Sequence, residues 1–333
     1  MHNLITDLPG IAVGHATDLV LGSGCTAVLF DAPATVAASI RGGAPGGRDT
    51  AMLEPEMTRQ EIDAVVLSGG SAYGLDAAGG AQAWLREQGR GFRLREALVP
   101  LVPAAIVFDL LNGGDKGWGR FAPYRELGYA AAQGAVHGGF PLGSVGAGTG
   151  ATTATLKGGL GSASARTQGG LLVGAIVAVN AVGSATIGNG RHFWASPWEV
   201  GREFAGLGMP AHPDTRPFMK GAPARATTVA LVATNARLTK AQAKRLAIMA
   251  DDGLARAIQP AHAPMDGDTV FAAATGTAGA GVAVDDRALA LLGHAAACVL
   301  ARAIARGVFH ATALPHPGAL ADWHQRFGQA ATR

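Results

Sequence analysis

Strand-like apolar segments occur in pairs along this chain, and helical segments follow them in pairs. A doubly wound parallel sheet requires regular alternation of strand and helix, which this order does not provide. Stacked sheets with helical outer layers fit the order better. The expected strands cover residues 25–30, 35–40, 62–67, 171–180, 227–234 and 269–274.

Turn and cap signals connect these segments. The sequence DAPA at 31–34 favours a turn, so the first two strands are expected to form a hairpin. The glycines after residue 68 lead into a helix that ends near Gly89, Thr239 is the expected N-cap of a second helix, and 285–308 is a long apolar helix. The glycine-rich segment 138–165 is too long to be an idle linker in a compact domain.

Composition excludes several classes of protein. The 333 residues are 48% hydrophobic and only 15% charged, which indicates a heavily buried protein, and we expect one compact domain over 1–333. The net charge is +3 without a run of five basic residues, which argues against a nucleic-acid partner. No basic leader with an apolar core and no uninterrupted membrane-span pattern is found, so we expect a cytoplasmic location and no membrane partner. Cys25 and Cys298 lack metal or redox spacing.

Two glycine-containing motifs carry weak signals. GSVGAGTGATT at 143–153 matches neither the dinucleotide-binding nor the phosphate-loop pattern. SGGSAYG at 68–74 falls between a strand and a helix, as a nucleophile elbow does, but Tyr73 stands where that motif needs glycine. Ser71 as a hydrolase nucleophile therefore competes with a plain turn or capping role.

Several polar residues interrupt the apolar pattern where chemistry is possible. HAPMDGDT sets His262, Asp266 and Asp268 close together before a strand, as a metal site, a carboxylate pair that orients protons, or an ordinary acidic turn. Lys157 stands alone in the glycine-rich segment, either solvated or functional. Asn180 ends a wholly apolar strand, either as a strand-ending turn residue or in a functional role.

Six ordered blocks of sequence resemble the DmpA family of self-processing aminopeptidases, and especially its nylon-oligomer hydrolase branch. They extend over nearly the whole chain, which makes the resemblance far more specific than any single motif. The blocks are DLPGIAVGHATD, GGSAYGLDAAGG, GAGTGAT followed by Lys157, VAVNAVG, TTVALVATNARL and IQPAHAPMDGDT.

The resemblance implies a four-layer αββα sandwich and a chain that cuts itself immediately before a Ser or Thr. The matching bond joins Ala226 to Thr227, so the expected products are 1–226 and 227–333. Thr227 becomes the nucleophile, while Thr228 supports it or continues the strand. A hydroxyl needs an adjacent base, and the freed α-amino group, with a reference pKa of about 7.7 to 8.0, suits that role.

The resemblance also implies roles for four other residues. Asn180 would donate to the oxyanion of the tetrahedral intermediate, and Lys157 would place positive charge near the nucleophile. Asp266 and Asp268 would orient the amine and hydroxyl of Thr227. Family members need no cofactor, so none is expected. Small peptides or amides are the expected substrates, and a homo-oligomer, a tetramer or larger, is the expected assembly.

Two departures from the family pattern bear on specificity and maturation. The aminopeptidases carry an acidic and an aromatic residue shortly before the position of Asp109, whereas this chain has Ile106 and Phe108 in the expected substrate pocket, which also includes Ser71 and Tyr73. Without that acid, a substrate's ammonium group lacks an anchor, so blocked amides should be accepted. The family usually has Gly or Asn before the nucleophile, and Ala226 resists left-handed backbone geometry by about 1 to 2 kcal/mol.

Two other readings of the sequence stay open. Ala226 could prevent maturation, which would leave an intact, catalytically silent protein that binds small amides or peptides. Alternatively, His262, Asp266 and Asp268 could serve a metal-dependent hydrolase. The leading interpretation, a self-processing hydrolase without a metal, predicts a divided chain.

Overall fold

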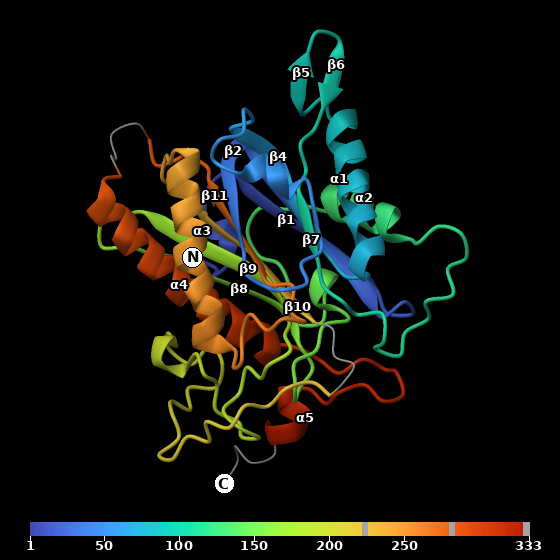
Figure 1. The fold of residues 1–333 in the computed structure, drawn as a ribbon, viewed down its shortest axis with the longest axis vertical. Coiled ribbons are helices and arrows are strands. Elements are labelled where there is room, and N and C mark those ends of the chain that lie inside the picture. Colours follow the sequence, from blue (N-terminus) through green and yellow to red (C-terminus); the bar gives the residue numbers. More distant parts are fainter. Residues whose placement is uncertain (222–225, 280–283, 329–333) are drawn as a thin grey trace.

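The computed structural model describes residues 1–221, 226–279 and 284–328 as four stacked layers, with helices outside and strands inside (Figure 1). Helices α1 (Asp76–Glu87) and α2 (Tyr124–Gln133) form one outer layer. Helices α3 (Lys240–Ala257) and α4 (Asp286–Phe309) form the other. The predicted αββα order of layers is confirmed.

The strands form one continuous hydrogen-bonded path that folds over on itself. Its order is β3-β7-β4-β2-β11-β10-β9-β8 in the described residues, and β1 pairs with β2 outside this path. A separate short hairpin joins β5 (Phe92–Leu94) and β6 (Ala97–Val99). The strands of the path are β1 (Ile11–Asp18), β2 (Ser23–Ile40), β3 (Gly47–Arg48), β4 (Glu61–Ser68), β7 (Ala104–Ile106), β8 (Gly159–Arg166), β9 (Leu172–Asn180), β10 (Thr227–Thr234) and β11 (Thr269–Ala274).

Strand β2 joins the two inner layers, and the predicted hairpin at DAPA is wrong. The chain runs through 31–34 as one strand whose register with β4 shifts between Leu29 and Ala34. The first half of β2 pairs with β1, and the second half pairs with β11. A bulge bends a strand without reversing it, so the two apolar runs belong to different layers of the sandwich.

Alternating side chains explain why three apolar clusters separate the four layers. In β10, Val229 and Leu231 face the central cluster between the two sheet layers, whereas Ala230 and Val232 face the cluster beneath α3 and α4. The strands of the other layer alternate in the same way between the central cluster and the cluster beneath α1 and α2. Strands buried on both faces read as continuous apolar runs, as they do in this sequence.

The two long helices begin where the sequence predicts. Thr239 accepts a hydrogen bond from the backbone of Gln242, and the Gln242 side chain returns to the Thr239 amide, which completes a capping box for α3. Among the described residues, α4 is the one helix long and apolar enough to cross a membrane, but 67% of its most apolar window is buried inside the structure. It packs against α3, β8 and β9, as a core helix does.

Strand β8 was not predicted and lies inside the glycine-rich segment. Glycines there allow backbones to approach closely rather than supplying a flexible linker. A Cβ on Gly161 would lie 1.8 Å from the carbonyl oxygen of Ala303 in α4, so the absence of a side chain sets the distance between strand and helix. The apolar periodicity of β8 is weak because its side chains are small.

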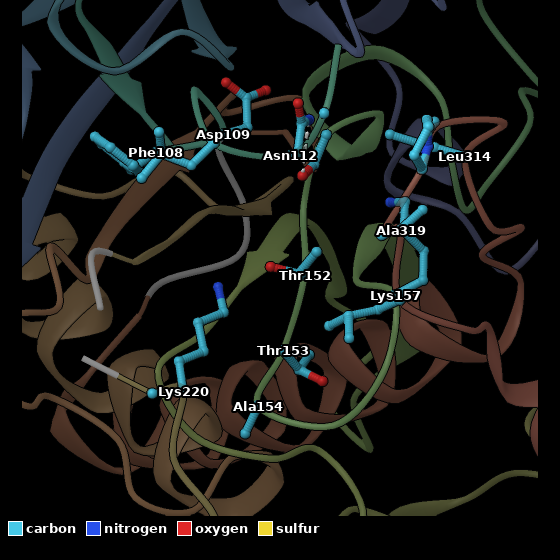
Figure 2. A pocket seen from close by; sticks show the side chains of 17 residues that line it. Phe108, Asp109, Asn112, Thr152, Thr153, Ala154, Lys157, Lys220, Leu314 and Ala319 are labelled. Carbon is cyan, nitrogen blue, oxygen red and sulfur yellow. Dashed lines mark hydrogen bonds between the residues drawn. The ribbon is translucent and has the colours of Figure 1, made fainter. Parts of the chain in front are cut away.

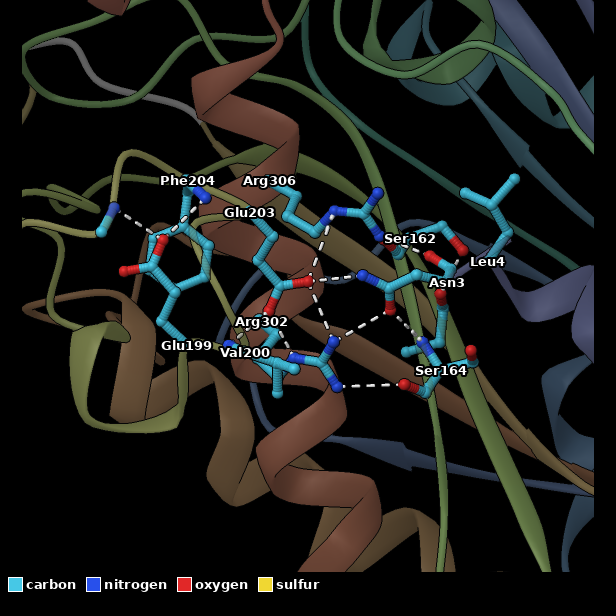
Figure 3. A network of polar contacts seen from close by, with 12 residues as sticks. Asn3, Leu4, Ser162, Ser164, Glu199, Val200, Glu203, Phe204, Arg302 and Arg306 are labelled. Carbon is cyan, nitrogen blue, oxygen red and sulfur yellow. Dashed lines mark hydrogen bonds and ion pairs between the residues drawn. The ribbon is translucent and has the colours of Figure 1, made fainter. Parts of the chain in front are cut away.

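A buried polar network fixes the N-terminal segment against α4 (Figure 3). Glu203 accepts hydrogen bonds from Arg302, whose guanidinium also donates to the Ser164 carbonyl at 3.0 Å and to the Asn3 side chain at 2.9 Å. Arg306, one turn later, reaches Glu203 at 3.7 Å. Two arginines thus share one carboxylate and satisfy carbonyl groups that β8 would otherwise bury unpaired.

Gly161→Ala should destabilise the fold, because its new methyl group would overlap the α4 backbone. Overpacking of this kind costs roughly 1 to 3 kcal/mol of unfolding free energy. Gly169→Ala is the matched control, since the nearest atom to its added Cβ is 3.9 Å away. Denaturant unfolding of both variants measures the difference, and equal midpoints would contradict the proposed close contact between β8 and α4.

Candidate active site

The ends of three central strands bring the predicted catalytic residues together. Strands β10 and β11 are parallel, so the segment that precedes β11 lies at the same edge as Thr227, the first residue of β10. Strand β9 is antiparallel to β10 and ends at that edge, where Asn180 is the register partner of Thr227. Asp266 precedes β11 and forms an isolated bridge with Ala226. The strand directions alone therefore collect residues that are far apart in sequence.

Two donors meet at the carbonyl oxygen of Ala226. The Thr227 hydroxyl donates to it at 2.5 Å, and the Gly267 backbone N–H donates at 3.1 Å. A Cβ on Gly267 would lie 2.7 Å from the Thr227 Oγ1, so a side chain there would displace the hydroxyl. Gly267 was not predicted, although its position between two aspartates was a signal. The backbone geometry of Ala226 depends on Arg225, which is outside the described residues.

The two aspartates make different contacts. Asp268 accepts from the Thr228 amide at 3.0 Å and from the His262 ring at 2.9 Å, so it holds the start of β10 through the second threonine. Asp266 accepts from the Val182 amide at 3.3 Å, while its other oxygen is buried without a hydrogen-bond partner among the described residues. Burial, and then the charge of Asp268, raise the pKa of Asp266 well above its usual range.

His262 lies between Asp268 and Asp251 rather than forming a metal site with Asp266 and Asp268. Its ring contacts Asp268 on one side and lies 3.7 Å from Asp251 on the other, and the hydrogen bond to Asp268 raises its pKa. Asp251 in turn accepts from Ser39 at 2.7 Å. Within the described ranges, no group of three His, Cys, Asp or Glu side chains has an arrangement suited to a metal ion.

Lys157 is buried and fully hydrogen-bonded by the loop that carries it. Its ammonium donates to the carbonyl oxygens of Gly148 at 3.0 Å, Ala151 at 2.8 Å and Gly158 at 2.8 Å. Burial lowers the pKa of Lys157 to about 7. Three carbonyls use all three of its donors, so in this structure Lys157 organises the glycine-rich loop and makes no hydrogen bond to Thr227.

Asn180, the register partner of Thr227, contacts a cationic residue that was not predicted. Its amide nitrogen donates to the Phe108 carbonyl at 2.9 Å, which leaves its second hydrogen for another acceptor. Its amide oxygen accepts from the Thr152 amide at 3.0 Å and from the Lys220 ammonium at 3.1 Å. Lys220 is half-buried, and burial lowers its pKa to about 8. It lies in a proline-rich loop without periodicity, so no sequence pattern marked it.

A cavity of about 550 Å³ opens at Phe108, Thr152 and Lys220, three residues that Asn180 contacts (Figure 2). Phe108 lines it as predicted, whereas Ile106, Ser71 and Tyr73 do not border this cavity. Ile106 is buried in β7, and Tyr73 is exposed and packs edge-on against a tryptophan ring. Ser71 donates its backbone amide to the carbonyl of residue 107, which agrees with a turn role. Asp109 borders the cavity, but Ser23 and the Gly70 amide occupy its two oxygens at 2.7 Å each.

Comparison with known proteins places this arrangement among peptidases. Residues 3–319 match the model of peptidase family S58. An uncharacterized aminopeptidase of Mycobacterium bovis is 40% identical, with 93% of this chain and 94% of that protein covered. A 6-aminohexanoate-oligomer endohydrolase of Kocuria sp. is 31% identical, with 81% of this chain and 74% of that protein covered. The resemblance inferred from the six blocks is confirmed.

Solved structures agree on the fold. A beta-aminopeptidase of Burkholderia sp. superposes with a TM-score of 0.72 at 22% identity, with 100% of this chain and 95% of that chain covered. The L-aminopeptidase D-Ala-esterase/amidase of Ochrobactrum anthropi, described as a variant of the Ntn-hydrolase fold, gives 0.72 at 21% identity, with 99% and 94% covered.

The lowered pKa of Lys157 predicts a pH-dependent stability. The unfolded chain holds this proton up to about pH 10.5, whereas the folded chain releases it near pH 7. Between these values the unfolded state binds more protons, so the unfolding free energy should rise with pH by on the order of 1 kcal/mol per pH unit. Lys157→Met should show a smaller rise, because Lys220, whose pKa burial lowers to about 8, contributes the remainder. Denaturant unfolding of both proteins from pH 6.5 to 9.5 measures it, and parallel curves would refute the assignment.

Proposed function

We propose that this chain, which belongs to peptidase family S58, hydrolyses small peptides or amides with Thr227 as a nucleophile released by self-cleavage. That it is a hydrolase of peptide or amide bonds follows from the family and from its relatives, which are named aminopeptidases and oligomer hydrolases. One observation carries the rest: the Thr227 hydroxyl lies 2.5 Å from the carbonyl oxygen of Ala226. This contact sets the hydroxyl beside the bond to be cut.

Self-cleavage begins in this proposal with attack of the Thr227 hydroxyl on the carbonyl carbon of Ala226. The Gly267 N–H stabilises the oxygen as negative charge develops there. The amide nitrogen of Thr227 receives the proton that the hydroxyl loses and leaves as an amine, the acyl group is held as an ester on the threonine oxygen, and water releases Ala226 as a carboxylate. Asp266 is the proton acceptor that we favour, because its raised pKa is closer to neutrality and one of its oxygens has no described partner.

Turnover uses the amine that the cut creates. The α-amino group of Thr227 takes the hydroxyl proton while the hydroxyl attacks the substrate carbonyl. Asn180 supports the oxyanion with its second amide hydrogen, and one such donor is worth roughly 10²- to 10³-fold in rate. Asp268 maintains the geometry through the Thr228 amide. The α-ammonium group returns the hydroxyl proton to the leaving amine, and water then hydrolyses the acyl-enzyme, which releases the acid and restores the Thr227 hydroxyl.

Other parts of the proposal follow from the family resemblance. The residues before Asp109 offer no acid to a substrate ammonium group, so we propose that blocked amides are accepted. We also propose a cytoplasmic homo-oligomer. Lys157 acts in our proposal by holding the glycine-rich loop next to Asn180, since its three donors are already used.

Purified protein should consist of two pieces divided between Ala226 and Thr227. Thr227→Ala should remain whole and inactive, because one hydroxyl performs both the cut and the turnover. Intact mass spectrometry together with amide hydrolysis measures both effects. A new N-terminus at any other residue would contradict the proposal, as would unchanged turnover in Thr227→Ala.

Gly267→Ala should slow the cut by about 100-fold, because a displacement of about 1 Å in a reacting group has that effect. The added Cβ would lie 2.7 Å from the Thr227 Oγ1 and 2.6 Å from the carbonyl oxygen of Ala44, so something must shift. The fraction of whole chain is followed on a denaturing gel, with Gly169→Ala as the control and the melting temperature as a check on folding. A folded Gly267→Ala protein that matures at the normal rate would rule out this placement.

A further inference from the structure

The cavity beside Asn180 has one ammonium group that its surroundings leave largely free. Lys157 spends its three donors on backbone carbonyls, and the two oxygens of Asp109 accept from Ser23 and Gly70. Lys220 differs, because its described hydrogen-bond partner is the neutral amide oxygen of Asn180. No Asp or Glu of the described chain lies within ion-pair distance of it. The charge of Asp266 acts on Lys220 from beyond that distance, and burial raises the pKa of Asp266 and so favours its neutral form.

Lys220 shares its position with a hydroxyl donor on the opposite wall. Figure 2 shows the Lys220 ammonium and the Thr152 hydroxyl pointing toward one another across the cavity. The amide oxygen of Asn180 lies between them, 3.1 Å from the ammonium and 3.5 Å from the hydroxyl. An ammonium and a hydroxyl beside a partly buried space are the donors that a carboxylate requires.

We propose that Lys220 binds a carboxylate carried by the acyl part of the substrate, with Thr152 as a second donor. The inference rests on the proposed function, and it assigns a substrate class: short dicarboxylic acids that form an amide at one end and keep a free carboxylate at the other. The positive charge of Lys220 then favours a substrate with a negative charge and disfavours one with a free ammonium group.

The acyl side is favoured because of Asn180. In the proposed mechanism its amide nitrogen holds the oxygen of the acyl carbonyl, which stays on the enzyme after the amine has left. Lys220 contacts the same side chain, so it lies beside the acyl group rather than the leaving group. Apolar walls formed by Leu111, Leu314 and Leu320 suit a short methylene chain between carbonyl and carboxylate.

Three anilides of equal chain length test the inference, because p-nitroaniline is the leaving group in each. They are glutaric acid mono-p-nitroanilide, its terminal primary amide as a neutral isostere, and 5-aminopentanoyl p-nitroanilide as the cation. The wild-type kcat/KM should favour the carboxylate over the isostere by about 10- to 100-fold, the range expected when a charged group gains a hydrogen bond. The cation should be the poorest substrate.

Lys220→Met and Lys220→Glu provide the matched variants, and the readout is the ratio of the three substrates within each enzyme. The ratio cancels any general loss of activity. In Lys220→Met the preference for the carboxylate should fall to within about threefold of unity, and in Lys220→Glu it should invert in favour of the cation. A wild-type ratio near unity would overturn the inference, as would an unchanged ratio in Lys220→Met.

The threonine mechanism and the carboxylate site can fail independently, and the experiments distinguish the two outcomes. If Thr227→Ala still hydrolyses the anilides, the threonine mechanism is wrong, yet the ratios continue to report on Lys220. Binding also tests the site without turnover: N-methylglutaramic acid should raise the melting temperature of Thr227→Ala, and should do so less when Lys220→Met is added. Equal shifts in the two proteins would overturn the carboxylate site.

Discussion

The pairing of β10 with its two neighbours determines where the candidate active site is located. Because β11 runs parallel to β10 and β9 runs antiparallel, the start of two strands and the end of a third meet at one edge. Thr227, Asn180 and the segment before β11 are brought together there by backbone hydrogen bonds alone. The side-chain contacts of the site, such as Asp268 to the Thr228 amide, refine a position that the sheet has already set. A slip in register would separate Thr227 from Asn180.

Much of this could be predicted from the sequence, because buried strands with continuous apolar runs have clear ends. The bounds of β10 and β11, the cap at Thr239 and the candidate positions of Asn180 and Asp266 followed from such patterns. The bend of β2 could not be predicted, since DAPA has the composition of a turn and the decision depends on partners far along the chain. Lys220 could not be predicted either, because its place in the site depends on a hydrogen bond to Asn180, which lies far from it in the sequence.

Burial changes the chemistry of the charged residues in ways that residue type does not reveal. Lys157 and Lys220 have the same side chain, yet the Lys157 ammonium donates to three carbonyl oxygens, whereas the Lys220 ammonium donates to a single amide oxygen. Asp266 and Asp268 are two residues apart, but Asp268 has three donors and Asp266 retains a buried oxygen without a described partner. Lys157 and Asp268 therefore hold the backbone in place, whereas Lys220 and Asp266 remain able to bind a ligand or a proton.

The position of β10 and β11 within the sheet has a mechanical consequence. Both strands follow Ala226 in sequence, yet they are inserted between β9 and β2, which precede it. A chain divided at that bond would still be joined along two complete ladders of backbone hydrogen bonds, with α4 packed on β8 and β9 as well. The strands of the two segments would therefore remain interleaved in one sheet. Separating the two segments would require breaking both the β9–β10 and the β2–β11 pairings. The fold can therefore stay intact after the backbone is cut.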